Sequence, residues 1–121
     1  MIHIQAQERS FQQVAQGVEI AVLRRSEDGG LTFLVRMAKG ALAPRHTHAG
    51  GEETFVIQGR LRIQHRTGRE GESSPDLVVS TGDYCFVPPG EDHDGVAEDD
   101  ALFLVEAPGG VAPSAPRAVR A

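Results

Sequence analysis

The chain has 121 residues, enough for one domain with a buried core and too few for two. Its hydrophobic fraction of 40% is ordinary for a globular protein, and it lacks the run of about 18 apolar residues that predicts a membrane span. A formal charge of −5 at pH 7 disfavours a nucleic-acid partner, because affinity for phosphates comes from clustered Lys and Arg. The sequence thus predicts a soluble protein with no nucleic-acid or membrane partner.

The start of the chain and its single cysteine bear on the compartment. Residues 1–20 lack the basic start and the apolar core of a secretory signal. Cys85 cannot form an internal disulfide, which agrees with a reducing environment, and we interpret it as a small buried hydrophobic residue. Both observations predict a cytoplasmic location.

Short apolar or alternating runs, separated by Gly and Pro, follow one another along the chain. Segment 5–16 fits either a short helix or a first strand, because Phe11 and Val14 suit both patterns. Strands are predicted over 18–26, 31–38, 53–58, 60–66, 76–80, 83–88 and 101–106. Residues 27–30 indicate a hairpin turn, and the polar residues 67–76 indicate a longer hairpin loop. Many short strands at this spacing are typical of a sandwich or barrel.

The C-terminal residues differ from the rest of the chain. From Ala107 onward the sequence contains Pro, Gly and Ala without periodicity. We therefore expect a single domain over residues 1–110 and a flexible tail over residues 111–121.

The histidines are grouped in a way that suggests metal chemistry. His46 and His48 are two residues apart, and side chains so spaced on a strand point the same way. A glycine-rich turn then leads to the acidic pair Glu52 and Glu53, and His93 follows a Pro-Pro-Gly turn that should aim it inward. Imidazoles with a carboxylate suit Fe, Mn, Ni, Cu or Zn. The pattern predicts a site for one divalent transition metal ion.

These two stretches resemble the two motifs of the cupin superfamily. The first motif, G(X)5HXH(X)3-4E(X)6G, is matched by Gly40, His46, His48, Glu52 and Gly59. The second, G(X)5PXG(X)2H(X)3N, is matched by Gly82, Pro88, Gly90 and His93, with Ala97 in place of the final Asn. The resemblance covers about residues 31–106. It implies an all-β fold, the double-stranded β-helix or jelly-roll barrel, whose metal is held by His46, His48, Glu52 and His93.

The motif spacing separates the two adjacent glutamates. Glu52 keeps the six-residue gap to Gly59, and Glu53 shortens it by one. Because a shift of one residue on a strand turns the side chain to the opposite face, we expect Glu52 to be the ligand and Glu53 to lie at the surface or behind the ligands.

Other side chains are candidates for contact with a substrate. In the strand 60–66, Arg60, Arg62 and Arg66 should line the solvated outer face. His65 is in phase with Leu61 and Ile63, so it should face the interior, as a hydrogen-bonded core residue or as a contact to ligands or substrate. Tyr84 and Phe86 alternate on the strand before His93, so one parity of that strand lines the cavity. Phe55, Phe86 and Phe103 should form an apolar wall that excludes water.

The function predicted from this resemblance is that of a metal-dependent dioxygenase. The stretch around His46 and His48 is similar, within cupins, to the ChrR-type domain and to acetylacetone and dihydroxyacetophenone dioxygenases. This likeness implies a small carbonyl substrate that chelates through oxygen. The alternative is a non-catalytic metal-dependent sensor or small-ligand-binding module; an isomerase or lyase that uses the metal only to polarise a carbonyl also remains open. A homodimer is expected, because a small jelly roll leaves edge strands to be covered.

Overall fold

Strands make up most of the chain in the computed structural model, which describes residues 1–113. A short 3-10 helix, η1, spans Ala6–Glu8. The strands are β1 (Gln12–Ala15), β2 (Val18–Arg25), β3 (Leu31–Met37), β4 (Leu42–Thr47), β5 (Glu52–Gln58), β6 (Arg60–Thr67), β7 (Ser73–Ser74), β8 (Leu77–Ser80), β9 (Tyr84–Val87), β10 (Asp92–Ala97), β11 (Ala101–Ala107) and β12 (Ala112–Pro113). Within the described residues, no helix is long and apolar enough to cross a membrane.

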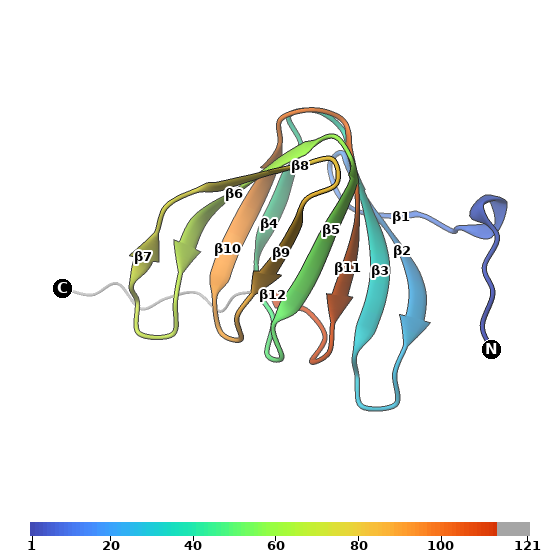
Figure 1. Cartoon of the computed structure of the whole chain (residues 1–121), viewed down its shortest axis with the longest axis horizontal. Helices are drawn as coiled ribbons and strands as arrows, with labels where there is room; N and C mark the ends of the chain where they lie inside the picture. The colour runs from blue at the N-terminus through green and yellow to red at the C-terminus, as the bar shows by residue number, and fades with distance from the viewer. Residues whose placement is uncertain (114–121) are drawn as a thin grey trace.

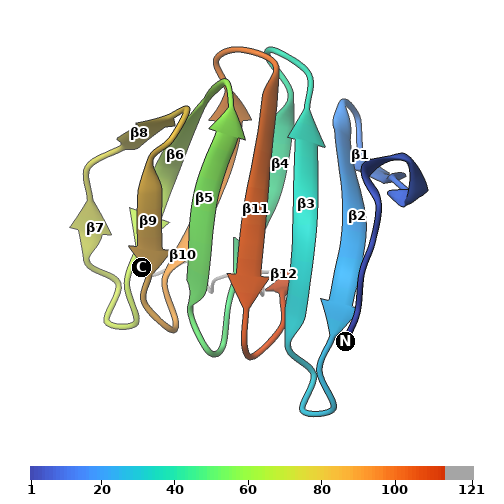
Figure 2. The same cartoon turned by 45° about the vertical axis from the view of Figure 1, so that its right-hand side comes forward.

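The strands form two antiparallel sheets that face each other. Sheet A has the order β1-β2-β3-β11-β5-β9, and sheet B has the order β12-β4-β10-β6-β7, with β8 also paired to β6. Figure 2 shows sheet A in front, with β4, β10 and β6 behind it. From β3 to β6 and from β9 to β11 the chain changes sheet at every turn (Figure 1). This alternation is the jelly-roll arrangement, so the predicted all-β double-stranded β-helix is confirmed.

Most of the predicted elements are present. All seven predicted strands correspond to strands of the structure, and segment 5–16 contains both a short helix and a strand, η1 and β1. The turn at 27–30 closes through a hydrogen bond from the Ser26 amide to the Gly30 carbonyl, 2.9 Å long. The polar loop 67–76 contains β7, which pairs with the end of β6. Of the predicted tail, residues 112–113 form β12 beside β4, and residues 114–121 lie outside the described part of the chain.

Two strands, β4 and β10, are missing from the runs that predict strands, and they carry His46 and His93. The sequence pattern places His93 just after a Pro-Pro-Gly turn and outside the predicted strands, whereas the structure places it inside β10. Their sequences, LAPRHT and DHDGVA, contain Pro, Gly and Asp, which are depleted in strands. Both are strands because they pair with each other, and β10 also pairs with β6.

The core lies between the two sheets. On β5 the side chains of Glu52, Thr54 and Val56 are buried, while Glu53 and Phe55 are exposed on the outer face. This alternation sends one parity of each strand into the barrel. The inward side chains form a core of Val18, Phe33, Val35, Met37, Val56, Leu61, Ile63, Val79, Ala97, Ala101, Phe103, Val105 and Ala107. The charged end of β5 therefore points into the same interior as the apolar core.

The turn between β5 and β6 depends on a glycine. Gly59 has φ +91°, and a Cβ at this position would lie 2.1 Å from the carbonyl oxygen of Asp100. Only glycine avoids both the backbone strain and this clash. The turn carries the chain from sheet A to sheet B, which accounts physically for the glycine that ends the first motif.

Candidate metal centre

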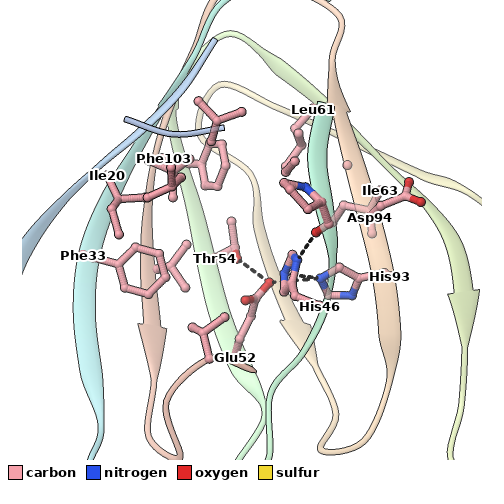
Figure 3. A pocket seen from close by; sticks show the side chains of 18 of the residues that line it. Ile20, Phe33, His46, Glu52, Thr54, Leu61, Ile63, His93, Asp94 and Phe103 are labelled. Atoms are coloured by element: carbon pink, nitrogen blue, oxygen red, sulfur yellow. Dashed lines mark hydrogen bonds and ion pairs between the residues drawn. The ribbon is translucent and has the colours of Figure 1, made fainter. Parts of the chain in front are cut away.

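Four side chains from three strands and one turn converge inside the barrel. His46 lies on β4 and His93 on β10, where antiparallel pairing places the two residues opposite each other. His48 follows the end of β4, and Glu52 begins β5. Each of the four offers one ligand atom, and these atoms lie within 4.8 Å of one another. Figure 3 shows His46, His93 and Glu52 meeting at one end of a cavity.

Hydrogen bonds on the far side of two imidazoles set which nitrogen faces the cluster. Nδ1 of His46 lies 2.8 Å from the Pro44 carbonyl oxygen, and Nδ1 of His93 lies 3.3 Å from a Glu91 carboxylate oxygen. Carbonyl and carboxylate oxygens only accept, so each of these hydrogen bonds requires the proton on Nδ1. The two Nε2 atoms are then lone-pair acceptors, and they face each other at 3.0 Å. Two acceptors at this distance repel unless a cation or a proton lies between them.

His48 points to the same conclusion. Its side chain is 1% exposed, and neither ring nitrogen has a hydrogen-bond partner among the described residues, although Nε2 lies against Glu52. An unsatisfied buried polar group costs about 1–3 kcal/mol. A metal ion would satisfy one of these nitrogens and the facing acceptors of His46 and His93. The donor set therefore fits a divalent transition ion.

The pKa changes favour the forms that bind metal. Burial lowers the pKa of His46 below its ordinary value, and neighbouring His93 lowers it further. Burial by itself raises the pKa of Glu52, but attraction to His48, His93 and His46 outweighs it, so the net change is downward. At neutral pH the site presents a neutral His46 imidazole and a Glu52 carboxylate, which are the forms that coordinate cations.

The predicted choice between the two glutamates agrees with the geometry. Glu52 is buried, and its carboxylate lies 3.8 Å from His93 Nε2. Glu53 is exposed on the outer face of sheet A and accepts a hydrogen bond from the Tyr84 hydroxyl, 2.7 Å long. The side chain of Glu53 therefore points away from the cluster.

A cavity of about 440 Å³ adjoins the four side chains. Ile20, Phe33 and Phe103 of sheet A enter it from one side (Figure 3). Leu61 and Ile63 of sheet B line the other side, and His46, Glu52, Thr54 and His93 form its polar end. A largely apolar pocket with a few convergent polar groups is the usual form of a small-molecule site.

The comparison with known families agrees with this geometry. A family model for the ChrR cupin-like domain matches residues 1–110, which include all four converging side chains. The chain belongs to this family.

Solved structures place this ChrR-like cupin among proteins of the same fold. A Methylibium petroleiphilum protein provisionally named acetylacetone dioxygenase has a TM-score of 0.76, with 16% identity over 96% of this chain and 82% of that chain. A chain from the complex of Rhodobacter sphaeroides SigE with the anti-sigma ChrR has a TM-score of 0.67 and 23% identity, over 85% of this chain and 51% of that chain. At these identities the likeness shows the fold alone.

One curated relative matches in sequence. The DNA damage-repair/toleration protein DRT102 of Arabidopsis thaliana is 32% identical over 72 residues, which is 60% of this chain. The chain spans only 22% of the length of that relative.

Three aromatic residues of this cupin that were predicted to contact substrate lie outside the cavity. Phe55, Tyr84 and Phe86 are 46%, 58% and 56% exposed. Pairing across sheet A sets Phe55 beside Tyr84 and Glu53 beside Phe86, so all of them share the outward parity. The prediction that they line the cavity is wrong, because alternation identifies the two faces of a strand without saying which one is inside. Phe103 does form the predicted wall, and Ile20 and Phe33 complete it without having been predicted.

The prediction that His65 faces the interior is also wrong. His65 has φ +54°, and the register of β6 against β10 shifts at this position, which is a β-bulge. Its side chain is 67% exposed and lies 2.8 Å from the Asp94 carboxylate. In Figure 3 the Asp94 carboxylate points away from the histidines. His65 therefore lies on the outer face of sheet B.

The same bulge reverses the predicted orientation of Arg66. Arg60 and Arg62 lie on the outer face as predicted, where both pair with Glu98. Arg66 instead turns towards Glu91, with two nitrogens 3.0 and 3.2 Å from one carboxylate oxygen. Glu91 is buried, and nothing in the sequence pattern singled it out.

The single cysteine packs as a small apolar residue. Cys85 is partly buried and packs against the core, as predicted. Burial raises the pKa of its thiol, which keeps it protonated.

Proposed function

We propose that this chain binds one divalent transition metal ion through His46, His48, Glu52 and His93, and that it acts as a dioxygenase on a small carbonyl compound. One observation carries the proposal: the converging side chains form the polar end of an apolar cavity. A structural metal site is closed by its ligands, whereas His46, Glu52 and His93 themselves line this cavity. A ligand in the cavity therefore reaches the metal position.

The cavity favours a ligand with an apolar body and an oxygen-bearing end. Phe33 and Phe103 hold the apolar part and exclude water, and the oxygen end lies beside Glu52 and the imidazoles. A volume of about 440 Å³ suits a small organic molecule. When bound, the ion supplies Lewis-acid chemistry and, as iron, the capacity to activate oxygen.

The charges around the cavity favour a neutral or monoanionic ligand. Arg45 is the basic side chain among the described residues that line it. Its guanidinium donates to the His65 carbonyl at 2.8 Å and to the Thr67 hydroxyl at 3.0 Å. Among the described lining residues, no Arg or Lys side chain is therefore free to bind a polyanion. A neutral or monoanionic ligand is favoured, and β-diketones and hydroxylated aryl ketones are ligands of this kind.

Oxygen uptake tests this proposal. The protein is loaded with Fe(II) under anaerobic conditions and mixed with oxygen and a panel of β-diketones and hydroxylated aryl ketones. We expect uptake with one member of the panel, and no uptake with the His48→Ala protein as control. Equal uptake by both proteins, or none with any ketone while the metal stays bound, would refute the dioxygenase. Turnover of a ketone without oxygen uptake would indicate an isomerase or lyase.

A second candidate is a metal-dependent sensor or ligand-binding module. Membership of the ChrR cupin-like family favours it, because ChrR is an anti-sigma protein in complex with SigE. In this role the cavity binds a small molecule without converting it, and the chain acts through a protein partner. A ligand that raises the melting temperature of the metal-loaded protein without being consumed would support this candidate over the enzyme.

A further inference from the structure

A chain of contacts, buried at His93 and Glu91 and partly buried at Arg66, leads from the metal cluster to the bulge in β6. His93 Nδ1 lies 3.3 Å from Glu91 Oε2, on the side of the ring that faces away from His46. The other carboxylate oxygen of Glu91 accepts from Nε and Nη2 of Arg66, at 3.2 and 3.0 Å. Arg66 Nη1 donates to the Pro75 carbonyl at 3.0 Å, which anchors the guanidinium to the loop before β8.

Glu91 and His93 are more deeply buried than ionisable side chains usually are. The exposed fractions of the side chains are 24% for Arg66, 7% for Glu91 and 4% for His93. Buried ion pairs are weak evidence of added stability, because desolvation offsets the attraction between the charges. A gain in stability alone therefore does not account for the ion pair between Glu91 and Arg66.

The bulge is what brings Arg66 to this position. Regular alternation along β6 would place Arg66 on the outer face, together with Arg62. At the bulge two residues of β6, His65 and Arg66, lie opposite the single residue His93, and His65 adopts a positive φ. The alternation of side chains along β6 is therefore reversed after His65, and Arg66 faces Glu91. The bulge thus exposes His65 and turns its neighbour Arg66 towards Glu91.

We propose that Glu91, held by Arg66, is a positioning residue that fixes the tautomer and the ring orientation of His93 for metal binding. The inference rests on the metal-binding part of the proposed function. A carboxylate acceptor at Nδ1 keeps the proton there and leaves the Nε2 lone pair directed at the cluster. It also raises the basicity of the imidazole as a ligand. For His46 the Pro44 carbonyl has the equivalent place, so Glu91 acts on His93 alone.

Zinc affinity and the tautomer of His93 together test this inference. Three variants are compared with wild type: Glu91→Gln, Glu91→Ala and Arg66→Lys. The matched control is Glu98→Gln, which removes a carboxylate paired with Arg62 at the other end of β10 and touches no converging side chain. Zinc affinity is measured by competition with a chromophoric chelator, and the tautomer by nitrogen NMR of the metal-free protein at fixed neutral pH. Thermal melts confirm that each variant is folded.

We expect Glu91→Ala to weaken zinc binding by about 10- to 100-fold, the range for losing the partner of a ligating histidine. Glu91→Gln, which keeps an acceptor but not the charge, and Arg66→Lys, which loses the planar fork, should lie between this variant and wild type. Wild-type His93 should carry its proton on Nδ1, and Glu91→Ala should lose this preference. Glu98→Gln should match wild type in both measurements.

Each contrary result has a separate meaning. Equal zinc affinity in wild type and Glu91→Ala, or an equal loss in Glu98→Gln, overturns the positioning role. A wild-type His93 protonated on Nε2 overturns it even when no zinc binds. Absence of zinc binding by wild type, with the Nδ1 tautomer present, refutes the proposed metal site and leaves only the contact between Glu91 and His93. If Glu91→Ala does not fold, the comparison rests on Glu91→Gln and Arg66→Lys.

Discussion

Replacement of Glu52 by glutamine should remove most of the bound metal, whereas the same change at Glu53 should remove almost none. The two residues are adjacent, have the same chemistry and lie on opposite faces of β5. Glu52 lies against His48 and is 3.8 Å from His93 Nε2, while Glu53 contacts the Tyr84 hydroxyl on the outer face. The pair therefore provides a matched test of the ligand set.

The expected magnitude follows from what glutamine keeps. It has nearly the volume of glutamate, so no cavity opens, and its amide oxygen can still accept from the Thr54 hydroxyl, which lies 3.3 Å from Glu52 Oε1. The substitution thus removes the charge and little else. Loss of a partner behind a metal ligand costs up to about 100-fold in affinity. Glu52 is itself one of the converging groups, so removal of its charge should lower the metal affinity by at least about 100-fold, which is about 2.8 kcal/mol.

The assay is zinc or iron content after dialysis against a weak chelator, followed by a competition titration of each variant. Thermal unfolding of the metal-free proteins serves as the folding control. Equal metal loss from the Glu52→Gln and Glu53→Gln proteins would refute the assignment of Glu52 as the acidic ligand. Full retention by Glu52→Gln would show that the three histidines suffice.

Three other predictions concern stability and assembly. Because burial lowers the pKa of His46, the unfolded chain takes up a proton there more readily than the folded one; urea titrations of metal-free protein should therefore show stability falling below about pH 6.5, less steeply in His46→Gln. Phe103→Ala should cost about 3–5 kcal/mol in the same assay, because Phe103 is buried in the core, and Phe86→Ala on the outer face should cost much less. Light scattering at tens of micromolar should give a dimer of the 13.0 kDa chain, and a monomer would contradict the covering of edge strands by a second copy.

The ligand set was predictable because the two cupin-like motifs contain all four residues, and for the three residues of the first motif local geometry supplies the reason. Spacing on a strand and the turn after it place His46 and His48 together, and the gap to Gly59 selects Glu52 over Glu53. The strands with strong alternation, such as β3 and β11, were predictable for the same reason, since their residue types favour extended backbone.

Tertiary structure decided what local geometry leaves open. LAPRHT and DHDGVA are weak strand sequences, and β4 and β10 form because each supplies the other's hydrogen bonds. Alternation on β5 and β9 divides the residues into two faces, and only the packing of sheet A on sheet B shows that Phe55, Tyr84 and Phe86 lie outside. The bulge at His65 reverses the parity of β6 beyond it, because one extra residue is accommodated opposite His93. The sequence by itself thus determined which side chains could bind a metal, and the pairing of distant strands determined which groups surround them.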